Sequence, residues 1–162
     1  VLDTLKTLDD SYCLLLVGTG YYEKQIHEYA RRIGVMDRCI FTGRISDREL
    51  LEGLYLCGDL FFFPSVYDNA PLVLREAASA GVPALLVRGS NAAECVIDNE
   101  NGYLAEESVA AMSARIAEIF ENTEEMKAVG ERAQQTIPVP WEVLAEQVEE
   151  KYAAIVERHG RK

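Results

Sequence analysis

The sequence is poor in basic side chains. It carries 16 Lys and Arg residues against 27 Asp and Glu residues, which gives a net charge of -11. A surface with this balance is a poor match for the phosphate backbone of nucleic acid, which binds clusters of lysine and arginine. We therefore expect no nucleic-acid partner. One small anionic ligand is still compatible with the charge, because a few backbone amides and one arginine can hold a diphosphate.

Long apolar runs and paired cysteines are also missing. No apolar run approaches the roughly 18 residues that a membrane-spanning helix needs, and no signal-peptide pattern is present. The four cysteines form neither a C-x-x-C pair nor a zinc-binding spacing. We expect reduced thiols that act as small hydrophobic side chains in a cytoplasmic protein. The residues concerned are Cys13, Cys39, Cys57 and Cys95.

The sequence does not open on methionine. From Val1 onwards, apolar side chains fall at positions 1, 2, 5 and 8, which is helical spacing with no capping residue before it. We therefore expect the sequence to open inside a helix, and we interpret the chain as a piece of a longer protein.

Short apolar runs alternate with amphipathic segments over most of the chain. Runs without polar alternation are typical of a parallel sheet that is covered on both faces, and their alternation with helices indicates βαβ units. The predicted fold class is α/β: a Rossmann-like doubly wound parallel sheet with a helical C-terminal appendix, in a single domain over residues 1–162. The strands are predicted at 13–18, 39–43, 59–63, 84–87 and from 103, and the helices at 22–33, 46–57, 71–80, 91–97, 107–121, 123–136 and 140–158. Ser46 is predicted to cap the second of these helices, with Glu49 completing a capping box.

A ligand of such a sheet is expected outside the carboxyl ends of the strands, near the loops 18–21, 43–46, 64–70 and 88–91. Gly18 and Gly20 either serve a tight turn or let a ligand approach the backbone at a helix N-terminus. Arg44, in the next loop, is either a solvated arginine or a ligand contact. The residues alone leave both alternatives open.

The stretch 61–89 carries the strongest chemical signal. An apolar strand ends in a loop that carries Asp68, and a helix follows. Asn69 is predicted to cap that helix, and Pro71 suits its first turn. The N–H groups of residues 70–72 then offer a seat for an anion, although proline lacks a donor.

Glu76 lies about two turns into the same helix, among leucine, valine and alanine. A carboxylate in such surroundings is costly unless it accepts hydrogen bonds. A ribose diol would supply two donors at a suitable spacing. The alternative is a surface glutamate that pairs with Arg75 or Arg88.

Taken together, these motifs resemble the C-terminal domain of retaining glycosyltransferases of the GT-B fold, in the group often called glycosyltransferase family 4. The family pattern is Pro-Ser, an acidic residue, seven residues, Glu-Ala and then Gly-x-Pro. The sequence reads Pro64-Ser65, Asp68, Glu76-Ala77 and Gly81-Val82-Pro83. Further matching segments between residues 14 and 152 are Val17 to Gly20, Phe41 to Gly43, Glu94, and Asp98 to Gly102.

The resemblance implies a role for each site residue. Glu76 would hold the ribose hydroxyls of a nucleoside diphosphate sugar. Asp68 would be the catalytic carboxylate, facing the donor sugar. The sugar and diphosphate would contact the backbone at the helix start, at Asn69, Ala70, Pro71 and Leu72. The nucleobase would lie against Arg44 and Ile45, and the donor would approach the backbone at Gly18 and Gly20.

Two positions depart from the family pattern. Asp68 stands where glutamate is usual, and Pro71 stands where glycine is usual. Both changes affect the sugar end of the site, so the nucleotide assignment is the firmer one. No Asp-x-Asp pair is present to hold a divalent metal, and no cofactor is expected.

The resemblance also implies that much of the enzyme lies outside the chain. The first strand of this domain, the Arg and Lys that follow it, and the whole N-terminal acceptor domain are expected elsewhere. The chain alone would then be inactive. In the family the last helix reaches back across the domain junction, so the apolar stripe of Trp141, Leu144, Val148, Tyr152 and Ile155 is either core packing or a surface for self-association.

The function expected from the sequence is therefore donor binding in a retaining glycosyltransferase of polysaccharide or cell-wall biosynthesis, acting on a glycan, lipid or small-molecule acceptor. The missing domain could bring peripheral contact with the inner face of a membrane. The alternatives are a sugar-nucleotide epimerase of GT-B architecture and a non-catalytic α/β ligand-binding module.

Overall fold

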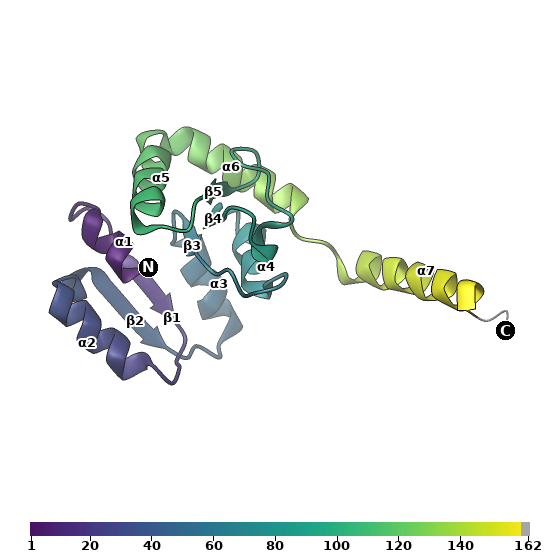
Figure 1. Cartoon of the computed structure of the whole chain (residues 1–162), viewed down its shortest axis with the longest axis horizontal. Coiled ribbons are helices and arrows are strands. Elements are labelled where there is room, and N and C mark those ends of the chain that lie inside the picture. The colour runs from purple at the N-terminus through teal and green to yellow at the C-terminus, as the bar shows by residue number, and fades with distance from the viewer. Residues whose placement is uncertain (160–162) are drawn as a thin grey trace.

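The computed structural model describes residues 1–159, which form a body of strands and helices from which the last helix projects (Figure 1). The α/β class and the alternation of strands with helices are confirmed. In chain order the helices and strands are α1 (Leu2–Thr7), β1 (Leu14–Val17), α2 (Glu23–Ile33), β2 (Cys39–Gly43), α3 (Arg48–Leu56), β3 (Phe61–Phe63), α4 (Leu72–Ser79), β4 (Ala84–Val87), β5 (Tyr103–Ala105), α5 (Val109–Glu121), α6 (Thr123–Thr136) and α7 (Trp141–His159), with short 3-10 turns at Met36–Arg38 and Asn91–Ala93.

The strands pair in parallel but form two sheets. β1 pairs with β2, Leu14 lying opposite Cys39, and the second sheet has the order β3-β4-β5. Within the described residues β1 and β3 each pair on one side only. The parallel pairing was predicted, but the division into two sheets was not, because an apolar run indicates a strand without identifying its neighbours.

The second sheet is covered on both faces, as predicted. All four residues of β4 are buried, and they alternate between two clusters. Leu86 packs with Leu74 of α4 on one face, and Leu85 packs with Ile116 of α5 on the other. Side chains of successive strand residues point to opposite faces, so one apolar strand serves both clusters.

The first sheet is covered on one face. Leu14 and Phe41 pack in a small cluster with Leu5 and Ala30 of the two helices beside them. The opposite face is open, with Leu15 36% and Ile40 55% exposed. The expectation that these strands are covered on both faces was therefore wrong for β1 and β2.

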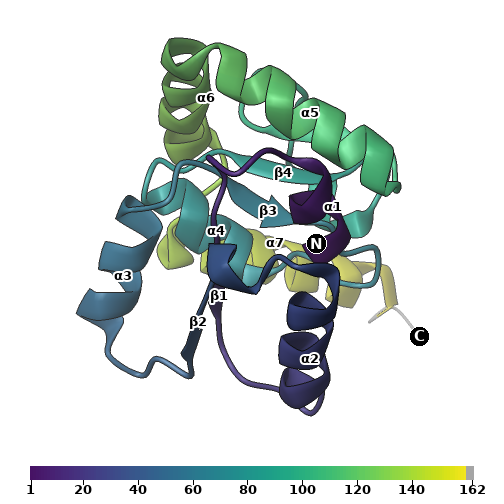
Figure 2. The same cartoon turned by 90° about the vertical axis from the view of Figure 1, so that its left-hand side faces the viewer.

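Helix α1 connects the two halves. It contacts α5 as well as α2 (Figure 2). Between the same halves the rings of Tyr12 and Phe120 meet edge to face, with centroids 5.1 Å apart. Arg38 donates to the carbonyl oxygens of Leu5, Leu8 and Asp9, which satisfies acceptors at the end of α1.

Several local predictions need correction. Asp47, not Ser46, caps α3: its side chain accepts from the N–H groups of Glu49 and Leu50. The helix expected over 91–97 is only the 3-10 turn Asn91–Ala93. Ser and Asp are both favoured at the N-cap of a helix. Two such residues side by side do not show from the sequence which of them caps α3.

The cysteines differ from one another. All four are free thiols. Cys39 packs at the edge of the small apolar cluster, as expected of a small hydrophobic side chain. Cys13, Cys57 and Cys95 are exposed, so that expectation was wrong for these three.

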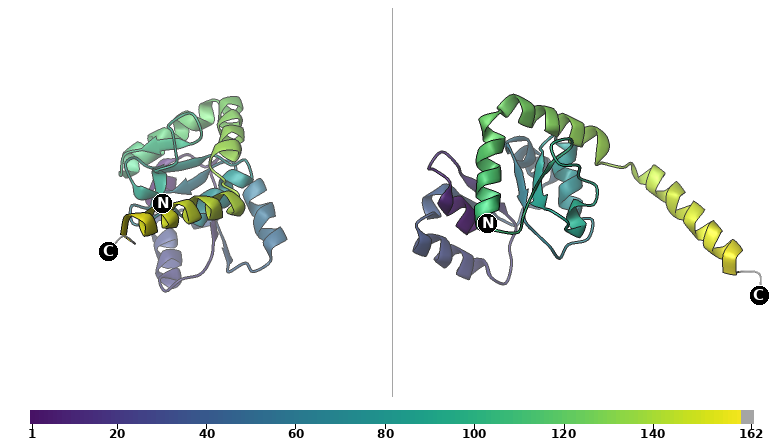
Figure 3. Two further views of the ribbon diagram at one scale, coloured as in Figure 1. Left: turned by 90° about the vertical axis from the view of Figure 1, so that its right-hand side faces the viewer. Right: turned by 45° about the horizontal axis from the view of Figure 1, so that its top comes forward.

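Helix α7 projects from the body, as Figure 1 and the right-hand view of Figure 3 show. None of its residues is buried, and Trp141 is 74% and Tyr152 66% exposed. Of the two interpretations of the apolar stripe, core packing within this chain is excluded. No helix among residues 1–159 has the length and apolar character needed to cross a membrane.

Candidate functional site

The expected site residues lie in loops that follow strand ends or, for Leu72 and Glu76, on the helix α4 that follows such a loop. Gly18 and Gly20 come after β1, Arg44 and Ile45 after β2, and Asp68 in the loop between β3 and α4. This is the edge of a parallel sheet at which ligands bind.

The turns after β1 and β2 are linked to each other. The Gly18 N–H donates to the Gly43 carbonyl oxygen over 2.8 Å. Gly18 has a φ of 120° and Gly43 a φ of 68°, which disfavours any side chain there. Of the next residues, Arg44 is exposed and Ile45 is half-buried. Gly18 and Gly43 therefore have a structural role in the two turns. The contacts of these turns neither require nor exclude a ligand beside them.

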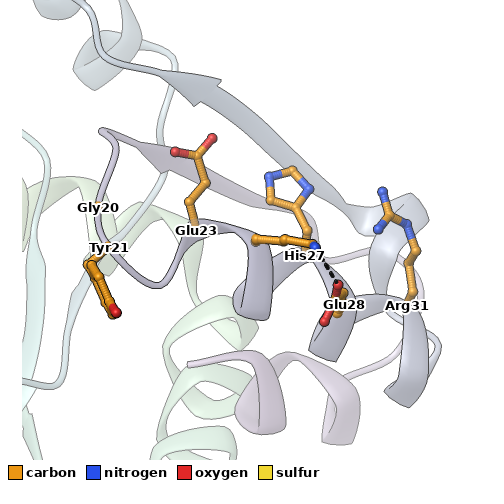
Figure 4. Close-up of a pocket in the computed structure, with 7 residues that line it drawn as sticks. Gly20, Tyr21, Glu23, His27, Glu28 and Arg31 are labelled. Carbon is orange, nitrogen blue, oxygen red and sulfur yellow. Dashed lines mark ion pairs between the residues drawn. The ribbon is translucent and has the colours of Figure 1, made fainter.

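Beside Gly20 the surface is hollowed along α2 (Figure 4). The hollow has a volume of about 510 Å³ and mixes charges of both signs, with Lys24 and Glu28 paired at 3.8 Å. His27, which also lines the hollow, stacks on Phe41, with ring centroids 3.8 Å apart. The exposed ion pair contributes little energy, and the stacked histidine is part of the packing of α2 on β2.

The loop after β3 is organised by its own polar side chains. The Ser65 hydroxyl donates to the exposed Asp68 carboxylate. The prediction that Asn69 caps α4 was wrong: its Oδ1 accepts instead from Nδ2 of Asn91 at 2.6 Å. Pro71 occupies the N-cap position of α4 without a side-chain cap. Ala70 has a φ of 46°, an uncommon conformation for a residue with a Cβ.

The N-terminus of α4 offers backbone donors. The first N–H groups of an α-helix have no carbonyl four residues earlier to bind. Leu72, the first helical residue, is exposed. With no acidic residue in the first turn of α4, the positive end of the helix dipole is left open to an anion.

Glu76 has a hydrogen-bond partner that neither sequence interpretation included. Its Oε2 accepts a hydrogen bond from the Tyr55 hydroxyl of α3 at 3.0 Å. Burial, together with this hydrogen bond, raises the pKa of Tyr55 well above its usual value. The hydroxyl therefore stays protonated and donates.

The alternative of an arginine partner for Glu76 is wrong within the described residues. Arg75 donates to the Ile137 carbonyl oxygen at 3.2 Å. Arg88 pairs with Asp98 at 2.6 Å and with Glu106 at 3.4 Å. Glu76 itself is exposed at the surface between α3 and α4.

The segment from Asp98 to Gly102 has a structural function. Burial raises the pKa of Asp98, but the hydrogen bonds from Arg88 and the Leu104 N–H, with the charge of Arg115, outweigh this and hold the pKa below its usual value. The buried Asn101 side chain bonds the Ile97 N–H and the Cys95 carbonyl oxygen. The turn is therefore locked to β5 and α5.

Two residues of the site escaped the sequence analysis. Tyr55 reaches Glu76 from α3, and Asn91 bonds Asn69 from the loop after β4. The position of loop 88–91 at the end of a predicted strand was a sequence signal that could have identified Asn91 as a site residue. Tyr55 sits inside a helix 21 residues before Glu76, and no spacing rule joins them.

The structure joins some of the predicted residues and leaves others apart. Contacts tie the loop after β3 to the loop after β4, and α4 to α3. Among residues 1–159 no hydrogen bond or ion pair ties Gly20, Arg44 or Ile45 to Asp68 or Glu76. In the same part of the chain no group of three or more His, Cys, Asp or Glu side chains is arranged to hold a metal ion.

Solved structures share this fold. A structure of Anabaena Alr3699/HepE in complex with UDP is 23% identical, with a TM-score of 0.81 over 94% of this chain and 44% of that one. The C-terminal domain of a glycosyl transferase group 1 family protein (LpcC) from Francisella tularensis is 14% identical, with a TM-score of 0.65 over 84% of this chain and 89% of that one. At these identities the likeness shows the fold, the Rossmann-like C-terminal half of a GT-B protein.

Sequence comparison gives the family. A GDP-mannose-dependent alpha-(1-6)-phosphatidylinositol monomannoside mannosyltransferase of Mycobacterium tuberculosis is 26% identical over 148 residues, 86% of this chain and 38% of the relative. The chain thus spans about two fifths of the length of that relative. Residues 1–136 match the family described as Glycosyl transferases group 1. The chain belongs to the glycosyl transferases group 1 family.

Proposed function

We propose that the chain is the donor-binding part of a retaining glycosyltransferase, which transfers a sugar from a nucleoside diphosphate sugar to an acceptor. The observation that carries the proposal is the Glu76 carboxylate, exposed about one turn into α4 and bonded to Tyr55 rather than neutralised by an arginine. A carboxylate held in this way can accept from two ribose hydroxyls.

The other site residues then act around the donor. Asp68 faces the sugar and stabilises the positive charge that develops at the anomeric carbon. The N–H groups at the start of α4 stabilise the departing diphosphate, because they point at the place where negative charge develops. Arg44 and Ile45 lie against the nucleobase. The proposal includes neither a metal ion nor a cofactor.

The remaining parts of the enzyme lie outside the chain in this proposal. A doubly wound sheet has the usual strand order 3-2-1-4-5-6. The order here is β2-β1 in one sheet and β3-β4-β5 in the other, which leaves the place of the central strand between β1 and β3. We propose that a parallel strand from a longer protein fills it, and that this strand, the basic pair after it and an N-terminal acceptor domain complete a cytoplasmic enzyme.

The exposed apolar side chains of α7 belong to the same proposal. In a two-domain protein they would lie at the domain junction. In the isolated chain we expect them to promote self-association. A mass in sedimentation equilibrium that stays monomeric at every concentration would contradict this.

The test is a titration of the chain, and of the two-domain protein, with UDP, GDP and ADP. We expect one of the three to bind, and Glu76→Ala to weaken it about 10- to 100-fold, the range for losing hydrogen bonds to a charged group. Glu52→Ala is the matched control, because Glu52 is an exposed glutamate on α3. The proposal fails if neither protein binds a nucleotide, or if Glu76→Ala binds as tightly as Glu52→Ala.

A further inference from the structure

Tyr55 packs against the second sheet and bonds the Glu76 carboxylate. Its side chain is half-buried between α3 and α4, and its ring meets Phe61 of β3 edge on, with centroids 6.1 Å apart. Phe61 in turn stacks on Phe63 at 5.7 Å. The ring is thus held from the sheet side, while its hydroxyl reaches Glu76 Oε2 at 3.0 Å.

A glutamate at the surface of a helix is mobile without such a contact. It rotates about three side-chain bonds, and fixing these on ligand binding costs conformational entropy. A tyrosine side chain has only two torsions, and here its ring packs edge on against Phe61. A hydrogen bond from a fixed donor therefore selects the direction of the Glu76 carboxylate before any ligand arrives.

The hydrogen bond also leaves the carboxylate able to accept. A carboxylate has about four acceptor sites on its two oxygens. Tyr55 occupies one on Oε2, and Oε1 accepts no hydrogen bond within the described residues. Because burial keeps the Tyr55 pKa high, the hydroxyl remains a donor and does not compete for ligand protons.

We propose that Tyr55 is a positioning residue of the donor site, which orients the Glu76 carboxylate so that its free acceptor sites receive the two ribose hydroxyls of the nucleotide. The inference rests on the proposed function. It adds that the affinity for the ribose depends on a residue of α3.

The experiment compares Tyr55→Phe with the unsubstituted protein, in the chain and in the two-domain protein. Each is titrated with UDP, GDP and ADP and with the 2′,3′-dideoxy form of each nucleotide. We expect Tyr55→Phe to weaken the bound ribonucleotide about 10-fold, as for one hydrogen bond to a charged group. We expect no change for the dideoxy form, because it has no ribose hydroxyls to receive.

Two further variants separate positioning from folding. In a Glu76→Ala background, Tyr55→Phe should cause no additional loss, since the tyrosine acts through the glutamate. Tyr29→Phe removes a tyrosine–carboxylate hydrogen bond to Asp3, which is outside the proposed site, and should leave the nucleotide affinity unchanged. Thermal unfolding of each variant checks that the fold is kept.

The outcomes distinguish the two proposals. The positioning role is overturned if Tyr55→Phe weakens the ribo and dideoxy forms equally, or has no effect while Glu76→Ala does. If Glu76→Ala has no effect, or no nucleotide binds to either protein, the proposed function is overturned and the role of Tyr55 with it.

Discussion

The two sheets of this molecule are built from similar apolar runs but reach different environments. β4 reads Ala-Leu-Leu-Val and is buried throughout, while β1 reads Leu-Leu-Leu-Val and alternates between half-buried and exposed residues. β4 has a strand on each side and helices on both faces. β1 has one strand partner and helices on one face. The difference teaches that burial here is set by the number of neighbours, not by the hydrophobicity of the strand.

Substituting matched leucines should give the largest contrast. Leu85→Ala removes a side chain of β4 that is 0% exposed, and we expect a loss of about 3–5 kcal/mol in the free energy of unfolding. Leu15→Ala in β1 starts from 36% exposure, and we expect a loss below about 1 kcal/mol. Urea unfolding of both variants measures the two values. Equal losses would mean that β1 is covered in solution.

The helix glycines offer a second contrast, with opposite signs. A Cβ at Gly130 of α6 would overlap the Gly81 carbonyl oxygen. We therefore expect Gly130→Ala to destabilise the fold by about 3 kcal/mol through overpacking. A Cβ at Gly53 of α3 meets nothing within 4 Å, so Gly53→Ala should stabilise the fold by up to about 1 kcal/mol through helix propensity. Thermal unfolding measures both changes in stability. A destabilised Gly53→Ala variant would show that the space beside Gly53 is filled in solution.

The smallest expected effect concerns the ion pairs that lock β5 to α5. Because the pKa of Asp98 is lowered in the folded state, its contribution is present above the unfolded pKa of about 3.9 and is lost as pH falls through the folded pKa. At pH 7 we expect Asp98→Asn to cost about 1–2 kcal/mol. As the pH falls from about 4 through the folded pKa of Asp98, the difference in stability between the variant and the original protein should shrink and disappear.

The control for Asp98 is Asp10→Asn in the first half of the chain. The Asp10 side chain is fully exposed and lies 3.7 Å from Arg38. A surface pair of this kind contributes less than about 1 kcal/mol, so the substitution should leave the unfolding midpoint unchanged at both pH values. If Asp98→Asn behaves like Asp10→Asn, the ion pairs of Asp98 stabilise the fold no more than an exposed surface pair does.

Much of the fold could be predicted from the sequence because its signals are local. The bounds of β2, β4 and α6 were predicted as the structure has them. Gly81, directly after the predicted helix 71–80, has a φ of 75°, which glycine adopts readily. These features depend on apolar runs and on the residues that interrupt them, so a short window of sequence contains the necessary information.

The candidate site was predicted only in part. Asp68 and Glu76 came from their spacing and their family resemblance, and both lie on the expected loop and helix. The partners of the site residues could not be predicted: Asn69 binds Asn91 instead of capping α4, and Glu76 binds Tyr55 instead of an arginine. Each of these contacts joins residues more than 20 positions apart, and a side chain with several possible partners chooses among them by proximity in space.

The sequence by itself determined the α/β class, the parallel strands and the carboxylate of Glu76 on a helix after a strand end. Only the tertiary structure decided that the strands of residues 1–159 divide into two sheets, that β1 has one strand partner there, and that Tyr55 bonds Glu76. The physical reason is that secondary structure follows from side chains a few residues apart. Sheet neighbours and hydrogen-bond partners, by contrast, are set by which distant segments the folded chain brings within contact.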